Sequence, residues 1–447
     1  MKLFPCNILI MFSISLLLSL ICLVYYDENY SAKALVYKHG KFDSSNTFEK
    51  FKINSANVKI EDEIYSCIGV EDEDKLDCHS DFPSTKEECL NRGCCWNGTR
   101  NNSKITEDGG YPTGVPDCYF PTNFAGYDVK YIKEHRRGIS ALLKRIKPSG
   151  FIKDIPNVNV SIYFHSQDTL RLRVTDADNT RYEVKLPNHN LDIPNLNKHY
   201  EFTKQYTVNL KSNGVLSITR TEDKQVIFHT NLSWMIYSDQ LLQLSSRLPS
   251  RFIYGLGQHK APLLRRVNWK RFTIFNRDRH PMKDHSTYGT HPFYLDLEES
   301  GKSHGVVLIN SNAMDIILQP APAITYRPIG GILDFFIFLG PKPLDVVRQY
   351  TRIIGTTFMP PYWSLGFHLC KYNYTTLKHT IEVWNRTRAA GIPFDTQWND
   401  IDYMHKYNDF TYDKTRYKDL PEFVQELHKV GMHFIPIVVI GQKKTVS

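Results

Sequence analysis

The 447 residues carry 55 basic and 47 acidic side chains, a formal net charge of +8, and 41% of them are hydrophobic. This composition is typical of a folded globular protein and excludes a largely disordered chain, while the length favours two or three domains. Basic residues are scattered along the chain and form no basic helix or arm, so we expect no nucleic acid partner.

The first predicted element is an apolar segment at residues 7–26, NILIMFSISLLLSLICLVYY, which contains no charged residue. It is long enough to cross a bilayer as one helix. No small-x-small cleavage motif follows it, and Lys2 precedes it, so we predict a single-pass signal anchor with residues 1–6 in the cytoplasm and a polar stalk at 27–62. A cleaved signal peptide is the alternative, and the protein would then be secreted or lysosomal. Both alternatives send the bulk of the chain into the secretory pathway.

Seven N-x-S/T sequons are consistent with that route. Each asparagine is a candidate for glycosylation, although the pattern also arises by chance. The candidates are Asn29, Asn97, Asn101, Asn159, Asn231, Asn373 and Asn385.

Six of the nine cysteines lie within residues 67–118, which indicates a small domain held by disulfide bonds. So short a segment buries little apolar surface, and three cross-links of about 2–4 kcal/mol each would supply much of its stability. The spacing alone leaves the pairing open. A zinc site is the alternative, but Cys94 and Cys95 are adjacent and belong to no CxxC pair.

The segment KLDCHSDFPSTKEECLNRGCCWN, with Cys67 before it and PDCYFP after it, resembles a trefoil (P-type) domain. The likeness includes all six cysteines of the cluster and Trp96, which follows the adjacent pair. It implies a trefoil domain at 63–122. It also implies the pairings Cys67–Cys95, Cys78–Cys94 and Cys89–Cys118.

Alternating apolar and polar residues dominate the region 123–350. Apolar side chains at every second position of 158–164 and 170–174 predict half-buried antiparallel strands. Further strands are predicted at RFTIFNR, HGVVLIN and ILDFFIFLG, so the expected fold is a β-sandwich. YGLGQH contains Gly-x-Gly without a following helix, and we predict a turn there. The polar residues 276–294 are predicted to form a long loop that could reach the site of a neighbouring domain.

The pattern changes in the region 351–447. Strands are predicted at 364–369, 394–400 and 433–440, with helices between them in TTLKHTIEVWNRTRAAGIP and KDLPEFVQELHKVG. This order predicts a parallel sheet with crossover helices, the start of a doubly wound or (β/α)8 fold. A full (β/α)8 barrel takes about 250 residues, so we expect an incomplete barrel here.

Asp400 and Asp402 stand at the end of the second of these strands, where ligands of such folds bind. The alternative is that both acids cap the next segment or line a loop. We expect no metal site, because His405 alone adds little to these carboxylates as a ligand set. Cys370, after the first strand, is expected to be a small buried residue rather than a nucleophile.

Three stretches, PPYWSLGFHLCKYNY, RTRAAGIPFDTQWNDIDYM and DFTYD, resemble the α-glucosidases of glycoside hydrolase family 31. NSNAMDIILQPAPAITYRPIGGILDFFIFLG resembles the galactose-mutarotase-like sandwich domain that precedes their barrel. The resemblance implies a retaining enzyme that releases terminal glucose from α-1,4-linked oligosaccharides without a cofactor or metal.

The same resemblance implies a role for four residues. Asp400 would accept hydrogen bonds from hydroxyls of the terminal glucose, and Ile401 would pack on its ring. Tyr372, in CKYNY, would shape the same subsite. Asp278, in FNRDRHP, would reach from the sandwich loop towards the leaving sugar.

Retention requires two carboxyl groups about 5–5.5 Å apart. The resemblance places the nucleophile in a W-x-D-M-N-E-type segment, and no such segment occurs in this sequence. Where the family has roughly I-V-D-P-x-I-S, the chain has IVVIGQKKTVS. We therefore expect a truncated sequence without catalytic residues, and no hydrolysis by this chain. The alternative function is a non-catalytic, membrane-tethered trefoil glycoprotein that binds carbohydrate or mucin.

Overall fold

The computed structural model describes residues 67, 69–71, 74–80, 84–97, 116–185, 194–198, 202–277, 280–320 and 322–439. The expected membrane span at 7–26 and stalk at 27–62 lie outside these residues, as do Asp278, Asn29 and Asn101. Within the described part, no helix is both long and apolar enough to cross a membrane.

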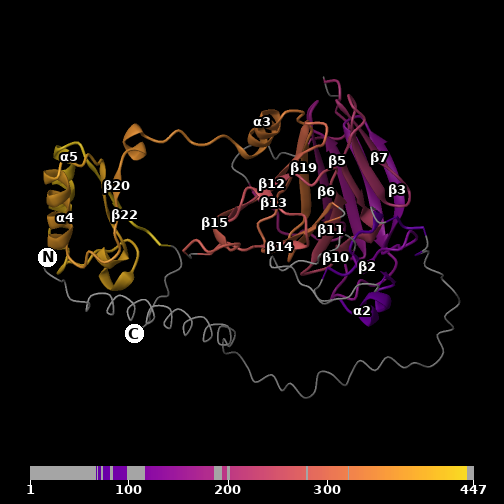
Figure 1. Cartoon of the computed structure of the whole chain (residues 1–447), viewed down its shortest axis with the longest axis horizontal. Helices are drawn as coiled ribbons and strands as arrows, with labels where there is room; N and C mark the ends of the chain where they lie inside the picture. Colours follow the sequence, from indigo (N-terminus) through magenta and orange to yellow (C-terminus); the bar gives the residue numbers. More distant parts are fainter. Residues whose placement is uncertain are drawn as a thin grey trace, which may run out of the picture. The chain divides into compact units, whose positions relative to one another are not determined.

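The first described unit is small and cross-linked, and is drawn in indigo in Figure 1. Helix α2 (Lys86–Asn91) begins at a capping box, in which the Thr85 hydroxyl accepts the N–H of Glu88 and the Glu88 carboxylate accepts the N–H of Thr85. Strand β1 (Cys95–Trp96) pairs antiparallel with β2 (Cys118–Tyr119).

The three disulfide pairings that the trefoil resemblance implied are confirmed: Cys67–Cys95, Cys78–Cys94 and Cys89–Cys118. The sulfur atoms of Cys89, Cys94 and Cys118 lie close enough together to suggest a metal site. All three are already disulfide-bonded, so the zinc alternative is wrong.

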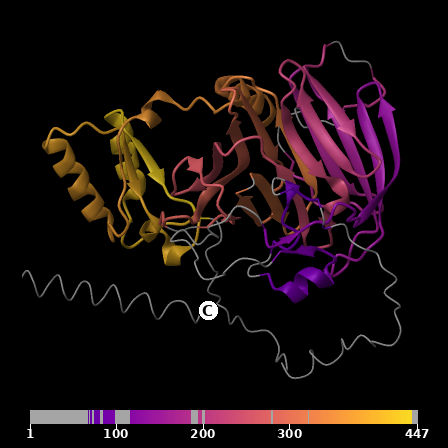
Figure 2. The same cartoon turned by 45° about the vertical axis from the view of Figure 1, so that its right-hand side comes forward.

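The β-sandwich predicted for the middle of the chain is confirmed, and Figures 1 and 2 show its strands from two sides. Among the described residues, two antiparallel sheets contribute to one large apolar core. The first sheet has the order β14 (Lys270–Ile274), β17 (Met314–Gln319), β18 (Ala323–Pro328), β11 (Leu242–Arg247), β9 (Val226–Asn231), β8 (Val215–Arg220), β7 (Tyr206–Leu210), with β10 (Ile236–Tyr237) beside β11. The second has the order β13 (Leu264–Arg265), β12 (Ile253–His259), β15 (Ser286–Leu297), β16 (Ser303–Leu308), β19 (Leu333–Phe338), β6 (Thr169–Asp176), β5 (Asn157–Phe164), β4 (Gly138–Arg145), β3 (Tyr127–His135).

Strand β6 departs from the predicted half-buried pattern, because its two arginines are buried as well as its apolar residues. Arg171 donates two hydrogen bonds, of 2.8 and 2.6 Å, to the carboxylate of Asp334 on β19, and its guanidinium lies 4.9 Å from the centre of the Phe336 ring. The neighbouring strand thus supplies the opposite charge that a buried guanidinium requires. Helix α3 (Pro343–Ile354) packs on β16 and β19, which places this part of the sheet between two apolar layers.

The turn predicted for YGLGQH is wrong, because these residues lie in strand β12. β12 pairs with β15 through register shifts at Gly255 and Gly257. Gly255 has φ +109°, and a Cβ there would lie 2.5 Å from the carbonyl oxygen of Phe293. The glycine therefore permits an irregular, close strand pairing. β15 also replaces part of the loop that was predicted for residues 276–294.

The beginning of a parallel barrel is also confirmed. Strands β20 (His368–Leu369), β21 (Thr396–Asn399) and β22 (His433–Pro436) pair in parallel in that order. Helices α4 (Leu377–Ala389) and α5 (Leu420–Lys429) connect them. The first strand is shorter than predicted, since residues 364 and 365 belong to the 3-10 turn η4 (Tyr362–Leu365).

Candidate functional site

The carboxyl ends of β20 and β21 bring Cys370, Asp400 and Asp402 close together. Leu369 at the end of β20 is opposite Gln397 of β21. Partial loss of solvent contact around the sulfur, and then the negative charges of Asp400 and Asp402, raise the pKa of the Cys370 thiol. Cys370 itself is exposed, so its predicted burial is wrong. The reason is that it follows the last paired residue of β20.

Asp400 begins the 3-10 turn η5 (Ile401–Tyr403) directly after β21. Its Oδ1 accepts the N–H of Ile401 at 2.7 Å, and within the described residues its Oδ2 accepts no hydrogen bond from the protein. The capping alternative is therefore correct for one oxygen, and the other oxygen can still accept hydroxyl groups. Ile401 is half-buried beside it.

Asp402 is a buried structural carboxylate with 4% of its surface exposed. Its Oδ2 accepts the N–H of Thr375 at 2.7 Å and the hydroxyl of Tyr417 at 3.0 Å. Burial, and then the charge of Asp402, raise the pKa of the Tyr417 phenol, so this hydroxyl keeps its proton and donates it. Asp402 thus fixes the segment after β20. The sequence offers no local signal for this role, because Tyr417 is 15 residues further along the chain.

Tyr372 lies on the segment that Asp402 fixes. Asn373 and Thr375 have φ values of +70° and +63° there, a conformation that needs such support. Tyr372 is 58% exposed and makes no hydrogen bond or ring contact with the described residues. Its side chain is therefore available to a ligand. The remaining candidate, Asp278, lies outside the described residues.

Side chains of β21 hold the neighbouring elements in place. Trp398 Nε1 donates to His368 Nδ1 at 2.8 Å, and Asn399 Nδ2 donates to Thr380 Oγ1 of α4 at 3.0 Å. Both contacts anchor the strand that ends at Asp400. The candidate carboxylate therefore stands on a strand that is tied to β20 on one side and to α4 on the other.

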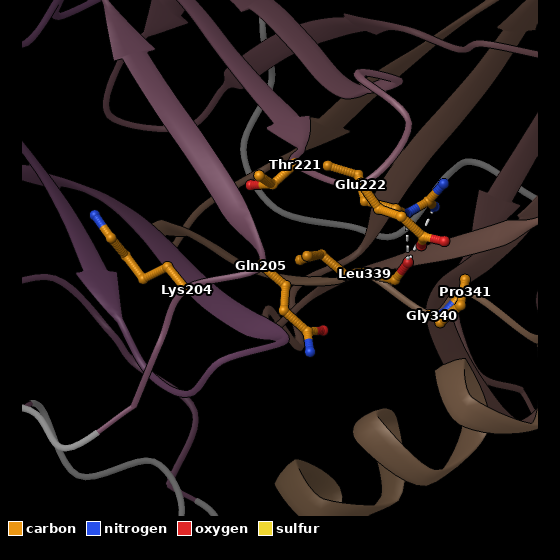
Figure 3. Close-up of a pocket in the computed structure, with 8 residues that line it drawn as sticks. Lys204, Gln205, Thr221, Glu222, Leu339, Gly340 and Pro341 are labelled. Atoms are coloured by element: carbon orange, nitrogen blue, oxygen red, sulfur yellow. Dashed lines mark hydrogen bonds between the residues drawn. The ribbon is translucent and has the colours of Figure 1, made fainter.

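A cavity of about 410 Å³ lies elsewhere, within the sandwich, as Figure 3 shows. The guanidinium of Arg220 lines it, but all five of its N–H groups are used by Glu298, Asp223 and the carbonyl oxygens of Ser303 and Leu339. Arg220 therefore has no N–H group left to bind an anion in this cavity. The cavity is lined by Lys204, Gln205, Arg220, Thr221, Glu222, Leu339, Gly340 and Pro341.

Arg220 and Glu298 form an ion pair that joins the two sheets of the sandwich. Arg220 ends β8 of the first sheet, and Glu298 follows β15 of the second. Burial, the largest influence, raises the pKa of Glu298, but hydrogen bonds from His304 and Arg220 outweigh it and lower this pKa to about 2. The pair is therefore structural.

All three regions of the chain match known domain families. Residues 67–121 match the trefoil (P-type) domain, and residues 159–316 match the glycosyl hydrolase 31 N-terminal galactose mutarotase-like domain. Residues 357–446 match the TIM-barrel domain of glycosyl hydrolases family 31. The chain belongs to glycoside hydrolase family 31.

Curated relatives of this family 31 chain are longer than it is. Lysosomal alpha-glucosidase of Bos taurus is 40% identical over 366 residues, which are 81% of this chain and 38% of that protein. Intestinal sucrase-isomaltase of Oryctolagus cuniculus is 39% identical over 372 residues, 82% of this chain and 20% of that protein. Among solved structures, the glucosidase II alpha subunit shares the fold, with a TM-score of 0.58 and 17% identity over 72% of this chain and 44% of that one.

Proposed function

We propose that this family 31 chain recognises the terminal glucose of α-1,4-linked oligosaccharides, as a glycoside hydrolase of the α-glucosidase type. The observation that carries the proposal is the state of Asp400. One of its oxygens is fixed by the N–H of Ile401, and the other is unused by the described residues, at the strand end where barrel enzymes bind ligands. The 40% identity to a protein named lysosomal alpha-glucosidase supports the choice of sugar.

The proposed roles follow from this placement. The free oxygen of Asp400 accepts sugar hydroxyls in charge-assisted hydrogen bonds, and Ile401 packs on the ring. Tyr372 borders the same subsite, while Asp402 acts only as a positioning residue for its segment. Asp278 would reach the leaving sugar from the sandwich.

Binding of maltotriose to the full chain, measured by titration calorimetry, tests this proposal. We predict that Asp400→Asn weakens the affinity at least about tenfold, which corresponds to about 1.4 kcal/mol of lost charge-assisted hydrogen bonding. Asp419→Asn, at an exposed residue before α5, is the matched control and leaves the affinity unchanged. Binding that survives Asp400→Asn would instead favour the alternative, a trefoil glycoprotein that binds carbohydrate elsewhere.

The chemistry has a separate test. Cleavage with retention would need a nucleophile and an acid that we do not find in the 447 residues. We predict that this polypeptide releases no nitrophenol from 4-nitrophenyl α-glucoside, while a longer transcript product carrying a W-x-D-M-N-E-type segment does. Release by the 447-residue chain that persists in the Asp278→Ala and Asp400→Ala variants would contradict the residue assignment.

A further inference from the structure

The trefoil unit is built onto the sandwich along a contact surface, here called the seam. Phe120 stacks on Trp234 with ring centroids 4.7 Å apart, and Asp74 forms an ion pair with Arg247. Gln319 of β17 accepts the N–H of Asp77 at 3.2 Å. The trefoil is therefore held by aromatic, ionic and hydrogen-bonding contacts.

A cavity of about 230 Å³ opens at this seam. It is smaller than the roughly 300–1,000 Å³ of typical ligand pockets, so its size suits one sugar ring rather than an oligosaccharide. The trefoil contributes Gly69, Val70, Asp74, Leu76, Phe120 and Thr122, and the sandwich contributes Asn213, Val215, His229, Asn231, Trp234 and Arg247.

Asn231, which lines the seam cavity, is the asparagine of an N-x-S sequon. It ends β9 and precedes the 3-10 turn η3 (Leu232–Trp234), where its Oδ1 accepts the N–H of Ser233 at 3.0 Å. Within the described residues its Nδ2 donates to no protein group. The capping bond thus fixes the amide by its oxygen and leaves the nitrogen for a substituent.

The surroundings of Asn231 combine apolar and polar groups. His229 lies on the same face of β9, two residues earlier, and burial, then the charge of Lys211, lower the pKa of its imidazole. At neutral pH this ring is therefore uncharged and can exchange hydrogen bonds with hydroxyl or amide groups. Phe120 and Trp234 supply an aromatic wall. A sugar ring, with an apolar face and polar edges, matches such a lining.

We propose that Asn231 carries an N-linked glycan whose first N-acetylglucosamine ring fills the seam cavity. Its formation requires a polyisoprenyl-pyrophosphate-linked oligosaccharide as donor. Nδ2 of Asn231 bonds to C1 of the sugar, the bond from C1 to the pyrophosphate oxygen breaks, the pyrophosphate leaves with the electron pair, and the amide gives up one proton. The product keeps Oδ1, so the cap on Ser233 persists. The proposal depends on the predicted entry of the chain into the secretory pathway, and it does not depend on the proposed glycoside hydrolase activity.

Other sequons within the described residues lie in different surroundings. Asn97, Asn373 and Asn385 are exposed, Asn159 is half-buried on β5, and none of the four lines the seam cavity. A glycan at Asn97 or Asn385 would project into solvent, whereas the first ring at Asn231 would be shielded by the trefoil and the sandwich. This difference gives the proposal an internal control.

The test uses the full chain, expressed in cultured animal cells and treated with peptide-N-glycosidase F, which converts each glycosylated asparagine to aspartate. Mass spectrometry then gives the occupancy and the release rate at each sequon. We expect Asn231 to be occupied, and its glycan to leave the native protein at least about tenfold more slowly than those at Asn97 and Asn385. After denaturation the rates should be equal. An unmodified Asn231, or native release as fast as at Asn97, would overturn the proposal.

A pair of variants tests the same idea without the enzyme. Asn231→Asp removes the glycan but keeps a side chain that caps helical turns well, and Asn385→Asp removes an exposed glycan. The first should lower the melting temperature by about 2–4 °C, since about 1 kcal/mol of contacts would be lost, and the second should not change it. Equal melting temperatures for the two variants would contradict a glycan packed in the seam.

Discussion

The β-sandwich and the barrel segment at 357–439 differ in how far each buries its own strands. Every residue of β16, β18 and β19 is buried, whereas no residue of β20 or β22 is. Large apolar side chains near the first barrel strand stay exposed, namely Phe358, Met359, Tyr362, Leu365 and Phe367. Stability is therefore concentrated in the sandwich, while the residues proposed to bind sugar lie mainly in the less buried segment.

The two regions also use carboxylates differently. In the sandwich, Glu298 compensates a fully buried guanidinium and is itself 3% exposed. In the barrel segment, the donors that Asp402 receives from the described residues are neutral, namely a backbone N–H and a phenol. Loss of a buried charge partner costs more free energy than loss of neutral hydrogen bonds. Substitutions of carboxylates in the sandwich should therefore lower the free energy of unfolding more than those in the barrel segment, where the loss of stability should stay local.

The largest effect is predicted for Glu298→Gln. The substitution removes the more deeply buried of the two carboxylates that pair with Arg220 and leaves only Asp223 of that pair, so the free energy of unfolding should fall by about 3 kcal/mol in urea titration. Glu222→Gln is the matched control, because Glu222 is 68% exposed and forms a surface ion pair with Lys302 near this network; it should cost less than about 1 kcal/mol. Similar losses in both variants would mean that the Arg220 pair does not stabilise the sandwich.

Acid should weaken the same contact. The pKa of Glu298 is about 2 in the folded protein and 4.5 for an unperturbed glutamate. Its stabilising contribution is present above pH 4.5 and is lost as the pH falls towards 2, by about 3 kcal/mol in total. Asp296, whose pKa is raised by burial, titrates in the opposite sense and offsets part of this loss.

The measurement is urea unfolding of the wild type and of Glu298→Gln between pH 5 and pH 3. Glutamine does not titrate, and Asp296 is present in both proteins, with Glu298 contributing less than burial to its raised pKa. The difference between their unfolding free energies should therefore shrink as the pH falls. A constant difference would show that the Glu298 carboxylate is not the titrating group.

The sequence predicts correctly those elements that are determined by residues close together in the chain. The alternation at 158–164 predicts β5, and the two threonines at 375 and 376, before an apolar helical pattern, predict the start of α4, whose N-cap is Thr376. The cysteine spacing, read as a trefoil, implies all three pairings correctly. In each case the signal lies within one element or one small domain.

Contacts distant in sequence account for what the sequence analysis missed. Arg171 is buried because Asp334, 163 residues away, neutralises it, and Gly255 belongs to a strand because Phe293 approaches its backbone. The role of Asp402 depends likewise on Tyr417 and on the left-handed backbone at Thr375. Alternation, capping and turn residues carry no information about such partners.

The smallest loss of stability is predicted for Asp402→Asn. This variant is also the sharpest test of the difference between the sandwich and the barrel segment. The amide can still accept one or two hydrogen bonds, but the negative charge is lost and its NH2 group occupies the place of Oδ1, which has no partner among the described residues. The segment around Thr375 should lose about 1–3 kcal/mol of local stability. Hydrogen exchange measured by mass spectrometry should become faster in peptides covering 370–376, and maltotriose affinity should fall, while urea unfolding of the sandwich stays unchanged. Asp419→Asn should alter none of these. If Asp402→Asn instead lowered the stability of the sandwich as Glu298→Gln does, the two regions would be one energetic unit, and the separation of core stability from the sugar-binding residues would be wrong.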